Sequence, residues 1–270
     1  MPGVHRNRSR ETQPTFPSGI GRQPETIEGG YVSAKDPMAR VDDLIRRFYF
    51  QVPIGERSLE AAIQEALAAG HTAALDAGCG SDAPLTRKFS QLIPTIGIDL
   101  CEGLPKDLRV VTGDLANLPF QDESFSLIFS RSVFEHLTHP DQVLSEFHRV
   151  LRPNGRCVIL TPNRYDYSSV VAALTPQWFH EWFVTRLYRS ASYDTFPTVY
   201  RANTPGFFRA VAKGTTWRIK RISGVRHYPV NLGFSRVLFR IGILYDSIIA
   251  RIGLTALQPS LLVVLERTGS

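Results

Sequence analysis

Apolar residues recur at two different intervals along the chain, and the two intervals alternate from about residue 56 onward. Spacing of three and four residues predicts helices over residues 38–50, 56–69, 83–92, 141–151 and 234–252. Short apolar runs predict strands over residues 73–77, 94–98, 108–112, 127–129, 156–161, 217–222 and 261–266. This alternation is typical of an α/β fold, and we expect a Rossmann-like, seven-stranded, mostly parallel sheet with helices on both faces.

Two regions depart from this alternation. Residues 1–36 are rich in Pro, Gly, Ser, Arg and Gln and have no periodicity, which predicts a flexible N-terminal arm. Residues 37–270 then form one domain. Inside it an aromatic-rich helical stretch interrupts the pattern, and we expect residues 162–215 to be a helical insertion over the ligand-binding side of the sheet.

Composition and charge narrow the class of protein. With 43% apolar residues, 20 Gly and 18 Pro in 270, collagen-like, fibrous and disordered classes are excluded. The net charge of +6 selects no partner by itself. Cys79, Cys101 and Cys157 lack metal-ligand spacing, and the basic first ten residues lead into no apolar run of a secretory signal. We therefore expect a cytoplasmic protein with no metal site.

Residues 234–253 contain an apolar stripe at helical spacing, interrupted by arginines. Two interpretations fit this stripe. The helix packs on its own sheet or on a second copy of the chain, or it lies in a membrane interface, where the basic residues nearby would help. The second interpretation places the protein at the inner face of the membrane as a peripheral protein, and the sequence does not determine the oligomeric state.

The glycine-rich segment after the first predicted strand is a candidate binding site. Gly78 and Gly80 lie between that strand and a helix, so the missing Cβ atoms let a ligand approach the backbone and the helix N-terminus. Residues 78–83 also satisfy the G-x-G-x-x-A pattern of dinucleotide dehydrogenases, with Asp99 as the matching acid. Alone, this segment does not decide which nucleotide cofactor binds.

Six segments in one order carry a resemblance to a known family. They read LDAGCG at 75–80, GIDL at 97–100, GDLANLPF at 113–120, DESFSLI at 122–128, FEHL at 134–137 and RVLRPNG at 149–155. In these segments the chain resembles the class I S-adenosylmethionine-dependent methyltransferases. It is most similar to the type 11 subgroup, which includes ubiquinone and menaquinone biosynthesis methyltransferases.

The resemblance implies that the cofactor is S-adenosyl-L-methionine. By that likeness, the loop after the first strand holds the methionine part, an acid after the second strand holds the ribose, and an acid after the third flanks the adenine. The next strand ends beside the sulfonium. The cofactor-binding residues implied in this way are Asp76, Gly78, Cys79, Gly80, Asp99, Leu100, Asp114, Leu115, Ser130 and Arg131.

The candidates for catalysis lie one turn beyond this pocket. His136, with its neighbour Glu135, is a candidate general base or orienting donor, although a histidine that only caps or packs a helix would give the same pattern. Asn163, Tyr165 and His180 follow the fifth predicted strand and are candidates for contact with the acceptor. A small-molecule, glycan or lipid-like acceptor, methylated at oxygen, fits this setting, whereas no nucleic-acid-binding module is present in the sequence.

Two other functions stay open on the residues alone. One is a non-catalytic scaffold that resembles a methyltransferase, because a fold does not establish catalysis. The other is a nicotinamide-dependent oxidoreductase of the Rossmann type, for which the sequence has no Tyr-x-x-x-Lys in the expected region.

Overall fold

The structure is a computed structural model that describes residues 41–49, 54–166, 197–229 and 232–269. The predictions for the arm of residues 1–36, for the aromatic part of the insertion and for His180 fall outside these ranges.

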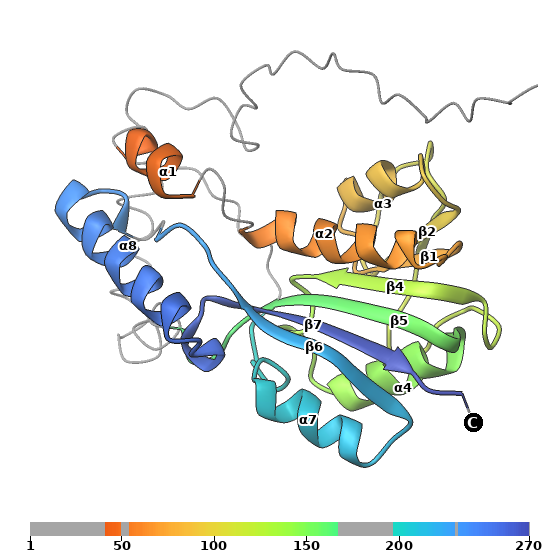
Figure 1. The fold of residues 1–270 in the computed structure, drawn as a ribbon. Coiled ribbons are helices and arrows are strands. Elements are labelled where there is room, and N and C mark those ends of the chain that lie inside the picture. Colours follow the sequence, from red (N-terminus) through yellow and green to blue (C-terminus); the bar gives the residue numbers. More distant parts are fainter. Residues whose placement is uncertain (1–40, 50–53, 167–196, 230–231, 270) are drawn as a thin grey trace, which may run out of the picture.

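Seven strands form one sheet in the order β3-β2-β1-β4-β5-β7-β6 (Figure 1). The strands are β1 (Ala74–Ala77), β2 (Thr95–Asp99), β3 (Val110–Thr112), β4 (Phe125–Arg131), β5 (Leu151–Pro162), β6 (Trp217–Val225) and β7 (Ser260–Arg267). β1 to β5 pair in parallel, and β7 lies antiparallel between β5 and β6. The predicted α/β fold with a mostly parallel, seven-stranded sheet is confirmed.

Helices cover both faces of this sheet. α2 (Gly55–Ala68) and α3 (Pro84–Phe89) lie on one face, and α4 (Pro140–Val150) and α7 (Pro205–Lys213) lie on the other (Figure 1). All four residues of β1 are buried, as expected for a central parallel strand covered on both faces. Successive side chains enter opposite clusters, because Ala74 packs on the α2 side and Leu75 on the α4 side.

α7 lies in the last part of the predicted insertion of residues 162–215. This helix contacts β6 and buries Phe208 in the same cluster as Phe134 and Phe147. Its start is capped by Thr204, whose hydroxyl accepts a hydrogen bond from the backbone N–H of Phe207 at 3.2 Å. The last part of the region is therefore a regular helix of the layered fold.

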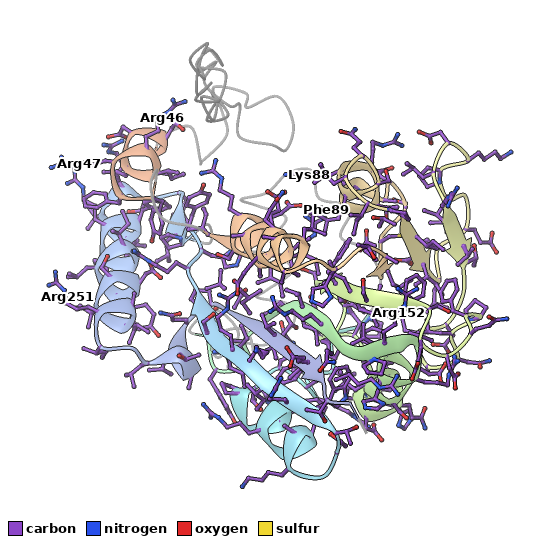
Figure 2. The ribbon with its side chains drawn as sticks, turned by 45° about the vertical axis from the view of Figure 1, so that its right-hand side comes forward. Arg46, Arg47, Lys88, Phe89, Arg152 and Arg251 are labelled. Atoms are coloured by element: carbon purple, nitrogen blue, oxygen red, sulfur yellow. The ribbon has the colours of Figure 1, made fainter. Side chains whose placement is uncertain are left out.

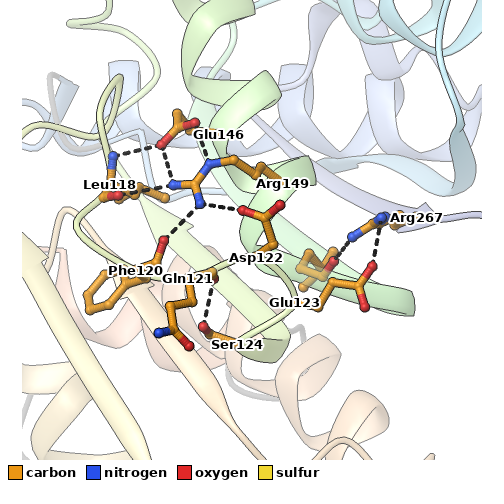
Figure 3. A network of polar contacts seen from close by, with 10 residues as sticks. Leu118, Phe120, Gln121, Asp122, Glu123, Ser124, Glu146, Arg149 and Arg267 are labelled. Carbon is orange, nitrogen blue, oxygen red and sulfur yellow. Dashed lines mark hydrogen bonds and ion pairs between the residues drawn. The ribbon is translucent and has the colours of Figure 1, made fainter.

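A polar network connects α4 to the loop between β3 and β4. The Arg149 guanidinium donates to the backbone carbonyls of Leu118 and Phe120 and to the carboxylates of Asp122 and Glu146, at 2.7 to 3.0 Å (Figure 3). Hydrogen bonds to these carboxylates raise the pKa of Arg149 above its usual range. Three of the six family-like segments thus meet in one network, which fixes the loop that follows β3.

α1 (Asp42–Tyr49) and α8 (Arg236–Arg251) pack against each other beside the sheet (Figure 1). The buried carboxylate of Asp246 accepts a hydrogen bond from the Tyr49 hydroxyl at 3.0 Å and one from Arg226 Nε at 2.6 Å. Because Arg226 directly follows β6, this contact joins both helices, called here the α1–α8 pair, to the sheet. Within the described ranges, no helix is long and apolar enough to span a bilayer.

Candidate active site

A cavity of about 620 Å³ opens at the carboxyl ends of the parallel strands. This is the edge at which open α/β sheets bind ligands, and the volume lies in the usual range for small-molecule sites. The cavity is lined by ten of the residues proposed from the sequence, namely Asp76, Gly78, Cys79, Gly80, Asp99, Leu100, Asp114, Leu115, Arg131 and His136.

The two glycines of the loop after β1 have different structural roles. Gly78 and Gly80 both have left-handed φ angles, of 80° and 72°. A Cβ on Gly78 would lie 2.1 Å from Cγ2 of Val133, whereas a Cβ on Gly80 would meet no atom within 4 Å. Gly78 therefore permits close packing against the segment after β4, and Gly80 leaves its backbone open toward the cavity.

The Asp99 carboxylate links the end of β2 to the glycine loop. One oxygen accepts a hydrogen bond from the Gly80 backbone N–H at 2.8 Å, and the other accepts one from the Cys101 N–H at 3.0 Å. A carboxylate has about four lone-pair sites, so two acceptor positions remain for ligand hydroxyls. Asp114 uses one oxygen to accept from the Ala116 N–H at 2.9 Å, which shapes the turn after β3.

Asp76 lies beneath the loop and is 1% exposed. Burial raises the pKa of its carboxyl group to about 7, against a hydrogen bond from Thr86 and the charge of Arg131, which both lower it. The Thr86 hydroxyl donates to the carboxylate at 2.7 Å. Asp76 therefore sits between its neutral and charged forms near neutral pH.

The residues at the end of β4 divide between cavity and core. Arg131 lines the cavity and forms an ion pair with Glu56 of α2, which also lines it. Ser130 is fully buried, is absent from the cavity lining, and its hydroxyl has no hydrogen-bond partner among the described residues. The ion pair balances the arginine charge next to the proposed position of a cationic sulfonium.

Glu135 and His136 point to different surroundings. Glu135 is buried outside the cavity lining, and Thr161 donates to its carboxylate at 3.3 Å. Burial raises the pKa of Glu135, while the neighbouring His136 lowers it. The backbone carbonyl of Glu135 also accepts hydrogen bonds from the backbone N–H groups of residues 199 and 200. His136 does line the cavity, with Nε2 4.0 Å from the Glu135 carboxylate.

The acceptor candidates after β5 are not brought into the cavity. The fully buried amide of Asn163 donates to three backbone carbonyls of residues 255–258, at 2.8 to 3.3 Å. Tyr165 is half exposed and lies outside the cavity lining. Asn163 thus holds the short helix η3 (Thr255–Leu257) against the end of β5, and we leave both residues out of the proposed site.

The cavity also contains residues that sequence patterns did not indicate. His227, from the segment after β6, lines it together with Glu56 and Ser260. Burial lowers the pKa of His227, and its Nε2 atom has no hydrogen-bond partner among the described residues. These residues lie far from the glycine loop in sequence and outside the family-like segments, so no local signal marks them.

Comparisons with known proteins show which families this chain resembles. Residues 75–159 match the family described as a methyltransferase domain. An S-adenosylmethionine-dependent methyltransferase of Mycolicibacterium smegmatis is 36% identical over 103 residues, which are 35% of this chain and 39% of the relative. The malonyl-[acyl-carrier protein] O-methyltransferase of Methylococcus capsulatus is 38% identical over 104 residues, covering 32% and 36%. The human mitochondrial 2-methoxy-6-polyprenyl-1,4-benzoquinol methylase is 33% identical over 100 residues, covering 37% and 26%.

A solved structure shows the same fold. It is a chain from the complex of the Haloferax volcanii methyltransferase activator Trm112 with a methyltransferase, at 16% identity and a TM-score of 0.51, covering 86% of this chain and 95% of that one. The matched region spans less than half of each of the three relatives named above. The chain contains a class I S-adenosylmethionine-dependent methyltransferase domain. Within that class, the domain is of the type 11 subgroup.

The cavity residues fit the cofactor of this class. Gly80 leaves the backbone open, and Asp99 retains acceptor positions for a ribose diol. Among the contacts of the described residues, one oxygen of Asp114 also stays available for an amine. Gly78, Cys79 and Leu115 line the space between these groups. We propose that these residues bind S-adenosyl-L-methionine.

Proposed function

We propose that this chain transfers the methyl group of S-adenosylmethionine to an oxygen atom of a small-molecule, glycan or lipid-like acceptor. The observation that carries this proposal is that two imidazoles, of His136 and His227, border the same cavity as the Asp99 and Asp114 carboxylates. When bound, the cofactor supplies an electrophilic methyl group on a sulfonium. Transfer to a hydroxyl would form the new C–O bond, break the bond between sulfur and the methyl group, and release S-adenosylhomocysteine. The hydroxyl would lose its proton, which a neutral imidazole can take.

Each part of the cavity has a role in this proposal. The glycine loop and Asp99 bind and orient the cofactor. This alignment of the methyl group with the acceptor is the main source of the rate acceleration in the proposal. The Glu56 carboxylate offsets the charge of Arg131. Burial keeps His227 in its neutral form at neutral pH, and this form accepts a proton. The side chains of Val133, Leu137 and Leu160 make part of the wall apolar, which suits an amphiphilic acceptor.

The alternatives make different demands on the same cavity. A nicotinamide-dependent oxidoreductase needs a group that delivers a proton in step with hydride transfer, and the comparisons favour a methyltransferase domain. A non-catalytic scaffold would bind the cofactor without turnover. The cytoplasmic location stays a prediction.

Cofactor binding is the first test. Asp99→Asn should weaken S-adenosylmethionine binding by roughly 100-fold or more, because each hydrogen bond to a charged acceptor contributes about 1.5–3 kcal/mol and the variant also disturbs the Gly80 contact. Titration calorimetry with S-adenosylmethionine, S-adenosylhomocysteine and NAD measures this. The matched control is Asp82→Asn, which removes an exposed carboxylate of the same loop that does not line the cavity.

Equal weakening in both aspartate variants would contradict the role of Asp99. Binding of NAD in place of S-adenosylmethionine would overturn the proposed function. With the cofactor established, transfer of a radiolabelled methyl group to fractions of a cell extract identifies the acceptor. Binding without transfer to any fraction would favour the scaffold.

The two histidines are tested by transfer kinetics. If His227 takes the acceptor proton, His227→Gln should lower kcat by about 100-fold or more and leave cofactor affinity unchanged. Burial places the pKa of His227 below its usual value, so the wild-type rate should fall as the pH drops through that lowered pKa, and the variant should lack this acid limb. His136→Gln, tested in parallel, tells which imidazole is the base. Unchanged kcat in both variants would contradict proton removal by either residue.

A further inference from the structure

The outer face of α8 exposes a continuous row of apolar side chains. Their exposed fractions lie between 48% and 66% for Val237, Ile241, Leu244, Ile248 and Ile252. These positions recur at intervals of three and four, so they form one stripe along the helix. Several large exposed aliphatic side chains on one helix mark an interaction surface rather than ordinary solvent exposure.

The opposite face of α8 already has its partner. Phe239 and Ile243 are buried against α1, and Asp246 is held by Tyr49 and Arg226. Packing against the chain's own residues therefore explains only half of the apolar positions on this helix. The interpretation that α8 simply docks on its own core accounts for the buried face and leaves the exposed stripe unexplained.

The charges around the stripe are basic. Arg240 and Arg251 are exposed on α8 and border one edge of the stripe by their helical spacing, while the single acid of this helix, Asp246, is buried. Figure 2 shows Arg46 and Arg47 of α1 and Arg251 of α8 pointing outward on the same side of the molecule. Asp42 offsets the charge of Arg46 and Asp43 offsets that of Arg236. The basic charge of this face therefore comes from Arg47, Arg240 and Arg251, which form no ion pair with a described residue.

A groove lies where the apolar stripe meets the basic edge. It is lined by Leu244 and Ile248 together with Arg251, Ser247 and Arg226. Aliphatic side chains next to a guanidinium and a hydroxyl match the boundary between acyl chains and anionic headgroups. An apolar stripe bordered by arginines is also the composition expected of a helix that lies in the interface plane.

We propose that the exposed face of the α1–α8 pair docks on the surface of an anionic lipid bilayer. The apolar stripe would enter the boundary between headgroups and acyl chains, and the arginines would contact the headgroups. A second copy of this chain has no comparable complementarity, because two such faces would bring like-charged arginines together. Docking does not depend on which atom the enzyme methylates.

The position of this face connects it to the cavity. Arg226 is bonded to Asp246 of α8, and the next residue, His227, lines the cavity. Just beyond the C-terminal end of α8, Asn163 holds η3 against the end of β5. Docking would therefore hold the acceptor side of the cavity close to the bilayer.

Flotation of the purified full chain with lipid vesicles tests the proposal. The wild type should float with vesicles of phosphatidylcholine mixed with phosphatidylglycerol, and less with phosphatidylcholine alone or at high salt. Leu244→Gln should lower partitioning by about tenfold, since one inserted leucine side chain has a free energy equal to that factor or more. Arg251→Gln should lower it by about fivefold.

Matched controls separate docking from general effects. Leu92→Gln removes an equally exposed leucine elsewhere on the fold, and Arg209→Gln removes an exposed arginine of α7, so both should float like the wild type. Cofactor binding by every variant shows that the fold is intact and keeps this result separate from the methyltransferase proposal.

Three results would overturn the proposal. The first is that the wild type floats with neither kind of vesicle, which would mean that another segment of this chain or a protein covers the stripe. The second is that Leu244→Gln and Leu92→Gln float equally well. The third is that light scattering shows a dimer that Leu244→Gln converts to a monomer while vesicles bind neither form, which would assign the face to a second copy.

Discussion

Gly78→Ala is expected to lower the free energy of unfolding by about 2–5 kcal/mol, because two penalties add at this position. The left-handed φ of 80° costs an alanine about 1–2 kcal/mol. The new Cβ would lie 2.1 Å from Cγ2 of Val133, and an overpacked contact of this kind costs about 1–3 kcal/mol. Urea unfolding of both proteins measures the sum.

Two further variants separate the penalties. Gly80 has a nearly equal φ of 72°, and a Cβ at this position would meet open space. Gly80→Ala should therefore lower the free energy of unfolding by only about 1–2 kcal/mol. Adding Val133→Ala to Gly78→Ala removes the clashing methyl group and should restore part of the stability as a coupling energy. Equal losses at both glycines would show that the close approach to Val133 has no energetic weight.

Asp76→Asn is expected to change how the free energy of unfolding depends on pH. Between low and high pH, the difference in this free energy between the variant and the wild type should change by an amount on the order of 4 kcal/mol. Burial raises the pKa of Asp76 from 3.8 to about 7 in the folded chain. The stability that this group contributes is therefore fully present below pH 3.8 and is lost as the pH rises through about 7. Asparagine does not ionise, so the stability of the variant relative to the wild type should increase across this range.

Unfolding by urea at a series of pH values measures the difference between the two proteins. Thr86→Val provides a second check, because it removes a hydrogen bond that lowers the pKa of Asp76. In that variant the loss of stability should move to higher pH. Parallel stability curves for the wild type and Asp76→Asn would show that the folded carboxyl titrates as it does in the unfolded chain.

The strand and helix order followed from local patterns because buried parallel strands and amphipathic helices each leave a periodic signal. The predicted limits of two strands differ from those in the structure. β4 begins at Phe125 rather than at residue 127, and β5 begins at Leu151 rather than at 156, because a register shift between Phe125 and Leu127 extends the pairing into polar residues. Ladder hydrogen bonds, which do not require apolar side chains, set these limits.

For the site, the sequence by itself determined the part of the cavity built on the loops after β1 to β4. Gly78, Asp99 and Asp114 each lie in a short segment whose residue types indicate a turn or a carboxylate directly after a strand. Because the carboxyl ends of parallel strands lie at one edge of the sheet, these residues meet there. The resemblance to methyltransferases rested on the same segments, and the family match covers them.

Only the tertiary structure decided the remaining parts. His227 and Glu56 reach the cavity because β6 ends and α2 begins beside it. The amide of Asn163 donates to the carbonyls of residues 255–258 instead of lining the cavity. The stripe on α8 could not be divided into a buried and an exposed half from periodicity, because both halves are apolar. Burial is a property of what lies opposite a side chain, and that is fixed by long-range packing rather than by neighbours in sequence.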